Sequence, residues 1–133
     1  MEYKDKCTLL STDSKIKCEE NNRKITFINS KRESVRIITV DGCQITEGVR
    51  CDYLIVHNKT EYFIELKGED IKHAFEQLIN SIKILGTSDS TARKSYVISS
   101  RSPLISAEIQ NIKLKFKRQY KSELIVKNNS VEV

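Results

Sequence analysis

Two adjoining segments in the middle of the chain alternate between apolar and polar side chains. Residues 51–56 read CDYLIV, residues 61–67 read EYFIELK, and the polar residues 58–60 lie between them. Alternation together with branched and aromatic residues favours β-strands, and a short polar connection favours an antiparallel hairpin. Pairing Val56 with about Tyr62 would bring the start of the first strand beside the end of the second. A slip of one residue would turn the side chains to the opposite face.

Helical periodicity follows this hairpin directly. Apolar residues recur three and four positions apart over residues 70–85, which predicts an amphipathic helix that covers the sheet. We expect Asp70 to cap its N-terminus and Gly86 to end it. A second helix is predicted over about residues 104–120, where Pro103 would begin it.

Further strands complete an α/β arrangement. Residues 24–40 predict a hairpin because two alternating segments flank a polar turn. Residues 95–100 predict a buried strand, and because it follows a strand and a helix we expect a right-handed crossover that sets it beside residues 61–67. Residues 123–126 predict an edge strand, and the C-terminal tail is expected to fray. The chain is therefore predicted to be one domain, residues 1–133, in which helices flank a mixed sheet of four to six strands.

Composition limits the classes of protein that this pattern can describe. The 133 residues are 38% hydrophobic, which is enough for one compact core. No apolar run approaches the roughly 20 residues that cross a bilayer, and the first residues lack the apolar region of a signal peptide. We therefore expect no membrane association and a cytoplasmic location.

The net charge of +5 is unevenly distributed along the chain. Residues 1–40 carry nine basic and six acidic residues, residues 41–100 carry seven and nine, and residues 101–133 carry seven and three. An acidic centre between basic ends fits a cation site beside phosphate-binding surfaces. The same balance also fits an ordinary lysine-rich protein. The basic residues within 113–121 either favour the end of the second helix electrostatically or bind phosphates.

Four cysteines, at positions 7, 18, 43 and 51, lack the C-x₂-C spacing that is typical of zinc sites. A zinc site assembled from all four is an alternative. In a cytoplasmic chain we expect reduced, partly buried thiols instead.

Three charged residues stand where buried strands rarely carry charge: Asp52, Glu65 and Lys67. Because side chains alternate along a strand, Glu65 and Lys67 share a face about 7 Å apart. Two close carboxylates repel each other, and Mg²⁺, which prefers one or two carboxylates with water and phosphate oxygens, relieves that repulsion. Such an ion activates water and stabilises charge on a phosphoryl oxygen, with help from a nearby lysine. The alternative is a surface hairpin with a solvated Glu/Lys pair.

The same residues carry a resemblance to a known family. Asp52, twelve intervening residues and Glu65-Leu66-Lys67 resemble the core signature of the PD-(D/E)XK nuclease superfamily, which includes restriction endonucleases and Holliday-junction resolvases. The similarity covers residues 48–85. Many members carry a helix glutamine near the metal site, followed four residues later by a tyrosine.

The match to that pattern is incomplete. Gln77 occupies the position of the helix glutamine, whereas Ser81 stands in place of the tyrosine. Cys51 stands where many members have a proline before the aspartate.

The resemblance implies a restriction-endonuclease-like fold and Mg²⁺- or Mn²⁺-dependent hydrolysis of phosphodiester bonds. It implies that Asp52 and Glu65 bind the metal, with the Leu66 carbonyl as a third ligand. Lys67 would be the catalytic lysine and Gln77 would support the site. DNA is expected over RNA by analogy with the superfamily. A homodimer is expected, because a chain this small would need a partner to cover both strands of a duplex.

Two questions stay open at this point. An additional acidic ligand is expected from Glu19 or Glu20, which lie in residues 14–21, a short helix or an irregular strand, or from Glu47. The alternative function is a non-catalytic nucleic-acid-binding or protein-assembly module that keeps the nuclease fold.

Overall fold

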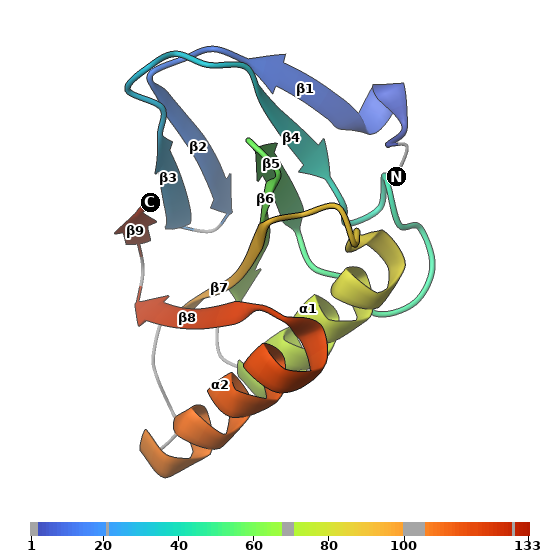
Figure 1. The fold of residues 1–133 in the computed structure, drawn as a ribbon, viewed down its shortest axis with the longest axis vertical. Helices are drawn as coiled ribbons and strands as arrows, with labels where there is room; N and C mark the ends of the chain where they lie inside the picture. Colours follow the sequence, from blue (N-terminus) through green and yellow to red (C-terminus); the bar gives the residue numbers. More distant parts are fainter. Residues whose placement is uncertain (1–2, 21, 68–70, 100–105, 129) are drawn as a thin grey trace.

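The computed structural model describes residues 3–20, 22–67, 71–99, 106–128 and 130–133. Its larger sheet has six strands in the order β1-β4-β5-β6-β7-β8 (Figure 1). Their bounds are β1 Thr8–Ser11, β4 Val35–Thr39, β5 Tyr53–His57, β6 Thr60–Lys67, β7 Ala92–Ser99 and β8 Glu123–Asn128. Neighbours from β1 to β6 pair antiparallel, whereas β6, β7 and β8 run parallel. The predicted mixed sheet is therefore confirmed.

Two helices make the parallel connections and cover one face of this sheet. Helix α1, Ile71–Leu85, joins β6 to β7, and helix α2, Ser106–Tyr120, joins β7 to β8 (Figure 1). Both predicted helices are confirmed over these residues, while the expected cap Asp70 and the expected first residue Pro103 lie outside the described residues. Neither described helix is both long and apolar enough to cross a membrane.

A second, smaller sheet covers the opposite face. It contains β2 Lys15–Glu20, β3 Arg23–Ile28 and β9 Ser130–Glu132 in the order β2-β3-β9. The sequence pattern did not predict this sheet, and within the open segment 14–21 residues Lys15–Glu20 form a strand. The prediction that the C-terminal tail frays is wrong, because β9 pairs parallel with β3.

The predicted hairpin over residues 24–40 is also wrong. Both segments are strands, but β3 pairs with β2 whereas β4 pairs with β1 and β5 in the other sheet. The connection between them crosses from one sheet to the other. Asn29, only 3% exposed, holds this connection, because its amide nitrogen donates to the carbonyl oxygens of Asp13 and Glu33 at 3.1 and 2.7 Å. A buried asparagine that satisfies backbone groups thus replaces the expected tight turn.

The alternation along β6 divides its side chains between two hydrophobic cores. Phe63 belongs to the core under the helices, together with residues of α1 and Phe116 of α2. Ile64 and Leu66 belong to the core between the two sheets. Because alternate residues share a face, Glu65 lies on the helix side of β6.

A disulfide between Cys7 and Cys43 corrects the expectation of four reduced thiols. Cys7 ends the short 3₁₀ helix η1, Asp5–Cys7, and the two Cα atoms are 5.7 Å apart. Pairing of β1 with β4 brings these residues together although 36 positions separate them in the sequence. The zinc alternative fails for the same reason, because a disulfide sulfur is not a thiolate ligand. Cys18 and Cys51 are free and buried.

Candidate functional site

The pairing of β5 with β6 brings Asp52 and Glu65 together. Strand β5 begins at Tyr53, which pairs with Ile64, so Asp52 directly precedes β5 while Glu65 directly follows Ile64 in β6. The backbone N–H of Asp52 donates to the Ile64 carbonyl oxygen at 3.1 Å, which bonds Asp52 to the partner of Tyr53 and holds it at this end of β6. The expected pairing of Val56 with about Tyr62 is confirmed to within one residue, because Val56 pairs with Glu61. The two acidic side chains meet at this point.

The two acidic side chains form a buried pair. Asp52 is 7% exposed and Glu65 is 2% exposed. Their carboxyl groups hydrogen-bond to each other. The second oxygen of Asp52, Oδ2, accepts a hydrogen bond from the Leu66 backbone N–H at 2.8 Å. This bond uses the amide of the residue next to Glu65, and it fixes the Asp52 carboxyl against the end of β6.

Burial raises the pKa of Asp52 to about 6. The Leu66 N–H and the hydrogen bond with Glu65 favour the charged carboxylate and lower this pKa, whereas the negative charges of Glu20 and Asp41 raise it further. The Asp52 carboxyl therefore holds its proton more firmly than an isolated carboxyl does. A bound cation would displace that proton.

The polar edge of α1 holds the segment that leads into Asp52. The Ser81 hydroxyl oxygen accepts from the Cys51 backbone N–H at 2.8 Å, and the Gln77 amide nitrogen donates to the Arg50 carbonyl oxygen at 3.1 Å. Asn80 donates to the Val49 carbonyl oxygen. Residues 49–51 are thus fixed by three side chains of one helix. Gln77 acts on the backbone before Asp52, and its own buried Oε1 has no hydrogen-bond partner among the described residues.

The roles of Ser81 and Asn80 were not predicted from the sequence. Ser81 was expected only to stand in place of a tyrosine. A buried serine among the apolar positions of α1 was the available signal, because a helix seldom buries a hydroxyl without a partner.

For the other two predicted site residues, Leu66 and Lys67, the structure tests only part of the prediction. Leu66 supplies its backbone N–H to Asp52, while its carbonyl oxygen as a metal ligand stays a prediction. Lys67 is the last residue of β6, and the position of its side chain lies outside the described part of the chain.

Of the three candidate acids, Glu20 at the end of β2 is close enough for its charge to raise the pKa of Asp52. Glu19 and Glu47 are exposed, and neither contributes to that shift.

The chemistry of the donors can be compared with what metal ions require. Within the described residues, no group of three or more His, Cys, Asp or Glu side chains lies close enough together to hold a metal ion. Mg²⁺ takes one or two carboxylates and completes its shell with water and phosphate oxygens, so the Asp52–Glu65 pair suffices for it. Burial raises the pKa of both free thiols, Cys18 and Cys51, to about 12 and keeps them protonated in the metal-free protein.

Comparison with known proteins adds no family to these observations, since no family model, no curated protein and no solved structure matches this chain.

Proposed function

We propose that this protein is a metal-dependent nuclease that hydrolyses phosphodiester bonds, with DNA as its expected substrate. The observation that carries the proposal is the contact between the buried carboxyls of Asp52 and Glu65 near the carboxyl end of β6. In open α/β sheets, ligands bind outside the carboxyl ends of the strands. An acid pair at that position is suited to a divalent cation and a phosphate.

The residues around the Asp52–Glu65 pair would each have a distinct role in the reaction. Asp52 and Glu65 hold Mg²⁺ or Mn²⁺, and when bound this ion supplies an activated water and neutralises charge on the phosphoryl oxygens. The Leu66 N–H orients the Asp52 carboxyl, and α1 fixes the approach to it through Gln77 and Ser81. Lys67 would orient the attacking water or stabilise the charge that develops on the phosphate.

The rival function is a nucleic-acid-binding or assembly module with the same fold and no catalysis. Two observations favour it. Burial favours the protonated form of Asp52, which needs no cation, and the described residues provide no group of three metal-binding side chains there.

Cleavage assays separate the two functions. Linear, circular, branched and single-stranded DNA, and RNA, are incubated with the protein in Mg²⁺, in Mn²⁺ and in EDTA. We expect metal-dependent cleavage that Asp52→Asn, Glu65→Gln and Lys67→Met each reduce by about a hundredfold or more. Asp13→Asn and Lys72→Met remove one exposed charge each and serve as matched controls with unchanged cleavage.

Metal binding is measured alongside by titration calorimetry with Mn²⁺, and folding of each variant by thermal denaturation. Cleavage that survives Asp52→Asn or EDTA contradicts the proposal. Nucleic-acid binding without cleavage in any metal, by a folded protein, supports the rival.

A further inference from the structure

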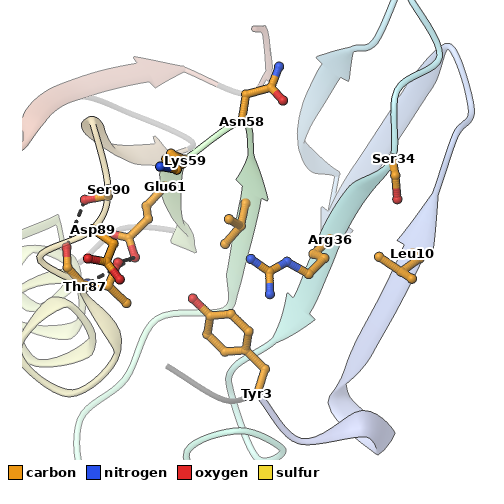
Figure 2. A pocket seen from close by; sticks show the side chains of 11 residues that line it. Tyr3, Leu10, Ser34, Arg36, Asn58, Lys59, Glu61, Thr87, Asp89 and Ser90 are labelled. Atoms are coloured by element: carbon orange, nitrogen blue, oxygen red, sulfur yellow. Dashed lines mark hydrogen bonds between the residues drawn. The ribbon is translucent and has the colours of Figure 1, made fainter.

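A second pocket lies at the other end of β5 and β6 from the Asp52–Glu65 pair, around the turn that joins the two strands. Its volume is about 330 Å³. Tyr3 and Arg36 line one side, Glu61, Thr87 and Asp89 line the other, and Lys59 lies at the turn (Figure 2). This volume is at the small end of the range for ligand-binding pockets, about 300 to 1,000 Å³.

The buried charge in the pocket wall is already neutralised. Glu61 is 2% exposed, and its Oε1 accepts from Arg93 Nε at 2.9 Å. Its Oε2 accepts from the backbone N–H and the hydroxyl of Thr87 at 3.2 and 3.4 Å. Glu61 therefore needs no charge from Arg36 or Lys59, which also line the pocket.

Arg36 is held in place with its hydrogen-bond donors available. Its guanidinium carbon lies 5.2 Å from the centre of the Tyr3 ring. A cation–π contact is electrostatic and needs no hydrogen bond from the guanidinium N–H groups. Among the described residues none hydrogen-bonds or ion-pairs with the Arg36 side chain. A guanidinium fixed in this way is suited to a phosphate or carboxylate, which it can bind with two parallel hydrogen bonds.

Lys59 is kept at a position that favours glycine. Asn58 and Lys59 form the two-residue turn between β5 and β6 with φ angles of 48° and 62°. Turns of this kind strongly prefer glycine at the second position, because a side chain is strained there. A basic side chain at that position adds a second positive charge to the pocket.

The opposite side of the pocket accepts hydrogen bonds. Asp89 lies beside Thr87 on the side away from Arg36 (Figure 2). The exposed Asp89 carboxylate makes no hydrogen bond or ion pair with another described residue. A ligand that spans the pocket would therefore carry an anionic group at one end and hydroxyl groups at the other.

We propose that this pocket binds a phosphorylated sugar, either free or as the sugar-phosphate unit of a nucleotide. The phosphate accepts hydrogen bonds from Arg36 and Lys59, and the sugar hydroxyls donate to Asp89. The proposal is independent of the nuclease function, because it uses none of the residues around Asp52 and Glu65.

Titration calorimetry with ribose 5-phosphate tests the site, with adenosine monophosphate, inorganic phosphate and ribose as comparison ligands. We expect saturable binding of one ribose 5-phosphate per chain, with about tenfold lower affinity or worse in Arg36→Met and in Lys59→Gly. Asp89→Asn should weaken ribose 5-phosphate and leave inorganic phosphate unchanged. Tighter binding of adenosine monophosphate than of ribose 5-phosphate would identify a nucleotide as the source of the sugar phosphate, and the reverse order would identify a free sugar phosphate.

Lys59→Gly gives a second, independent readout. It relieves the positive φ, so its melting temperature should rise while its affinity falls. Arg32→Gly is the matched control, because Arg32 also has a positive φ, of 50°, and an exposed basic side chain, but it does not line the pocket. It should leave affinity unchanged.

Three results would overturn the proposal: no saturable binding of ribose 5-phosphate to folded protein, equal affinity in wild type and Arg36→Met, or ribose or inorganic phosphate binding as tightly as ribose 5-phosphate.

Discussion

Asp52 and Glu65 show which features of the candidate site could be predicted from single residues and which could not. Charged residues in apolar strands were visible in the sequence, and the structure brings the two acidic side chains into contact. The register was not visible, because residues 51–56 and 61–67 allow several pairings that differ by one step. The turn at Asn58 and Lys59 decides it, and neither residue is the glycine that normally marks such a turn.

Burial disfavours the charged form of Asp52, so the folded protein is more stable when this carboxyl is protonated. Because the pKa of Asp52 rises to about 6 in the folded protein from the model-compound value of 3.8, the folded state binds the proton more tightly than the unfolded state. The free energy of unfolding therefore falls as pH rises through this window, and Asp52 costs stability above about pH 6.

Replacing Asp52 by asparagine should therefore stabilise the metal-free protein at neutral pH. Asparagine keeps an oxygen that can accept from the Leu66 N–H and carries no charge to desolvate. We expect Asp52→Asn to raise the free energy of unfolding at pH 7.5 by up to about 3 kcal/mol, and the gain to disappear below about pH 4. Urea denaturation in EDTA between pH 3.5 and 8 measures this difference. A gain that grows toward low pH would contradict it.

The elements that were predicted correctly are those whose pattern extends over many residues. Strand β6 and helix α1 have 8 and 15 residues, and their periods are unmistakable. Strands β1 and β9 have 4 and 3 residues, too few for a period to be recognised. The segments of β3 and β4 alternate correctly, but a strand pattern does not name its partner. Pairing is decided by long-range contacts, which is why the second sheet was missed.

At the end of α1, the sequence pattern predicted the position of a glycine but not the packing around it. Gly86 was expected after the last helical residue, and α1 does end at Leu85. Its backbone does not have the positive φ that usually explains a glycine at this position. A Cβ atom there would lie 2.6 Å from the Ile82 carbonyl oxygen and 2.8 Å from an Arg93 guanidinium nitrogen. Gly86 therefore avoids close contacts with both the last turn of α1 and Arg93, and no local pattern could predict the contact with Arg93.

Gly86→Ala should destabilise the protein by about 1 to 3 kcal/mol, because the added methyl group displaces either the helix end or Arg93, the partner of buried Glu61. Gly42→Ala is an informative comparison. Its Cβ would meet no atom within 4 Å, so only the positive φ of 74° opposes it, at about 1 kcal/mol. Urea denaturation compares the two variants. An equal or smaller loss in Gly86→Ala would show that Arg93 adapts without cost.

The fold has three layers, and the Cys7–Cys43 disulfide adds one covalent link to it. The helices cover one face of the six-stranded sheet, and the sheet of β2, β3 and β9 covers the other (Figure 1). Edge strand β1 contacts the rest of the sheet through β4, and it exposes Leu9 and Leu10 at 64% each. With so little apolar burial of its own, this segment depends on the Cys7–Cys43 disulfide that precedes it.

The disulfide should therefore contribute a large part of the stability of the folded chain. It closes a loop across 36 positions, and loop-closure entropy for a loop of this length corresponds to about 3 to 4 kcal/mol. It also secures the turn after β4, where the N–H groups of Val40 and Asp41 donate to the Asp52 carbonyl oxygen at 2.9 and 3.3 Å.

Reduction of the disulfide by a dithiol should lower the free energy of unfolding by about 3 to 4 kcal/mol, as should the double variant Cys7→Ser/Cys43→Ser. Urea denaturation with and without the reductant, with thiols counted in each sample, measures the loss. The double variant is the control, because the reductant should not change its curve. If wild-type protein with four free thiols unfolded at the same urea concentration as the oxidised protein, β1 and the turn after β4 would be held by their hydrogen bonds alone, including the bond from the Lys4 backbone N–H to Gln44 Oε1 at 2.8 Å.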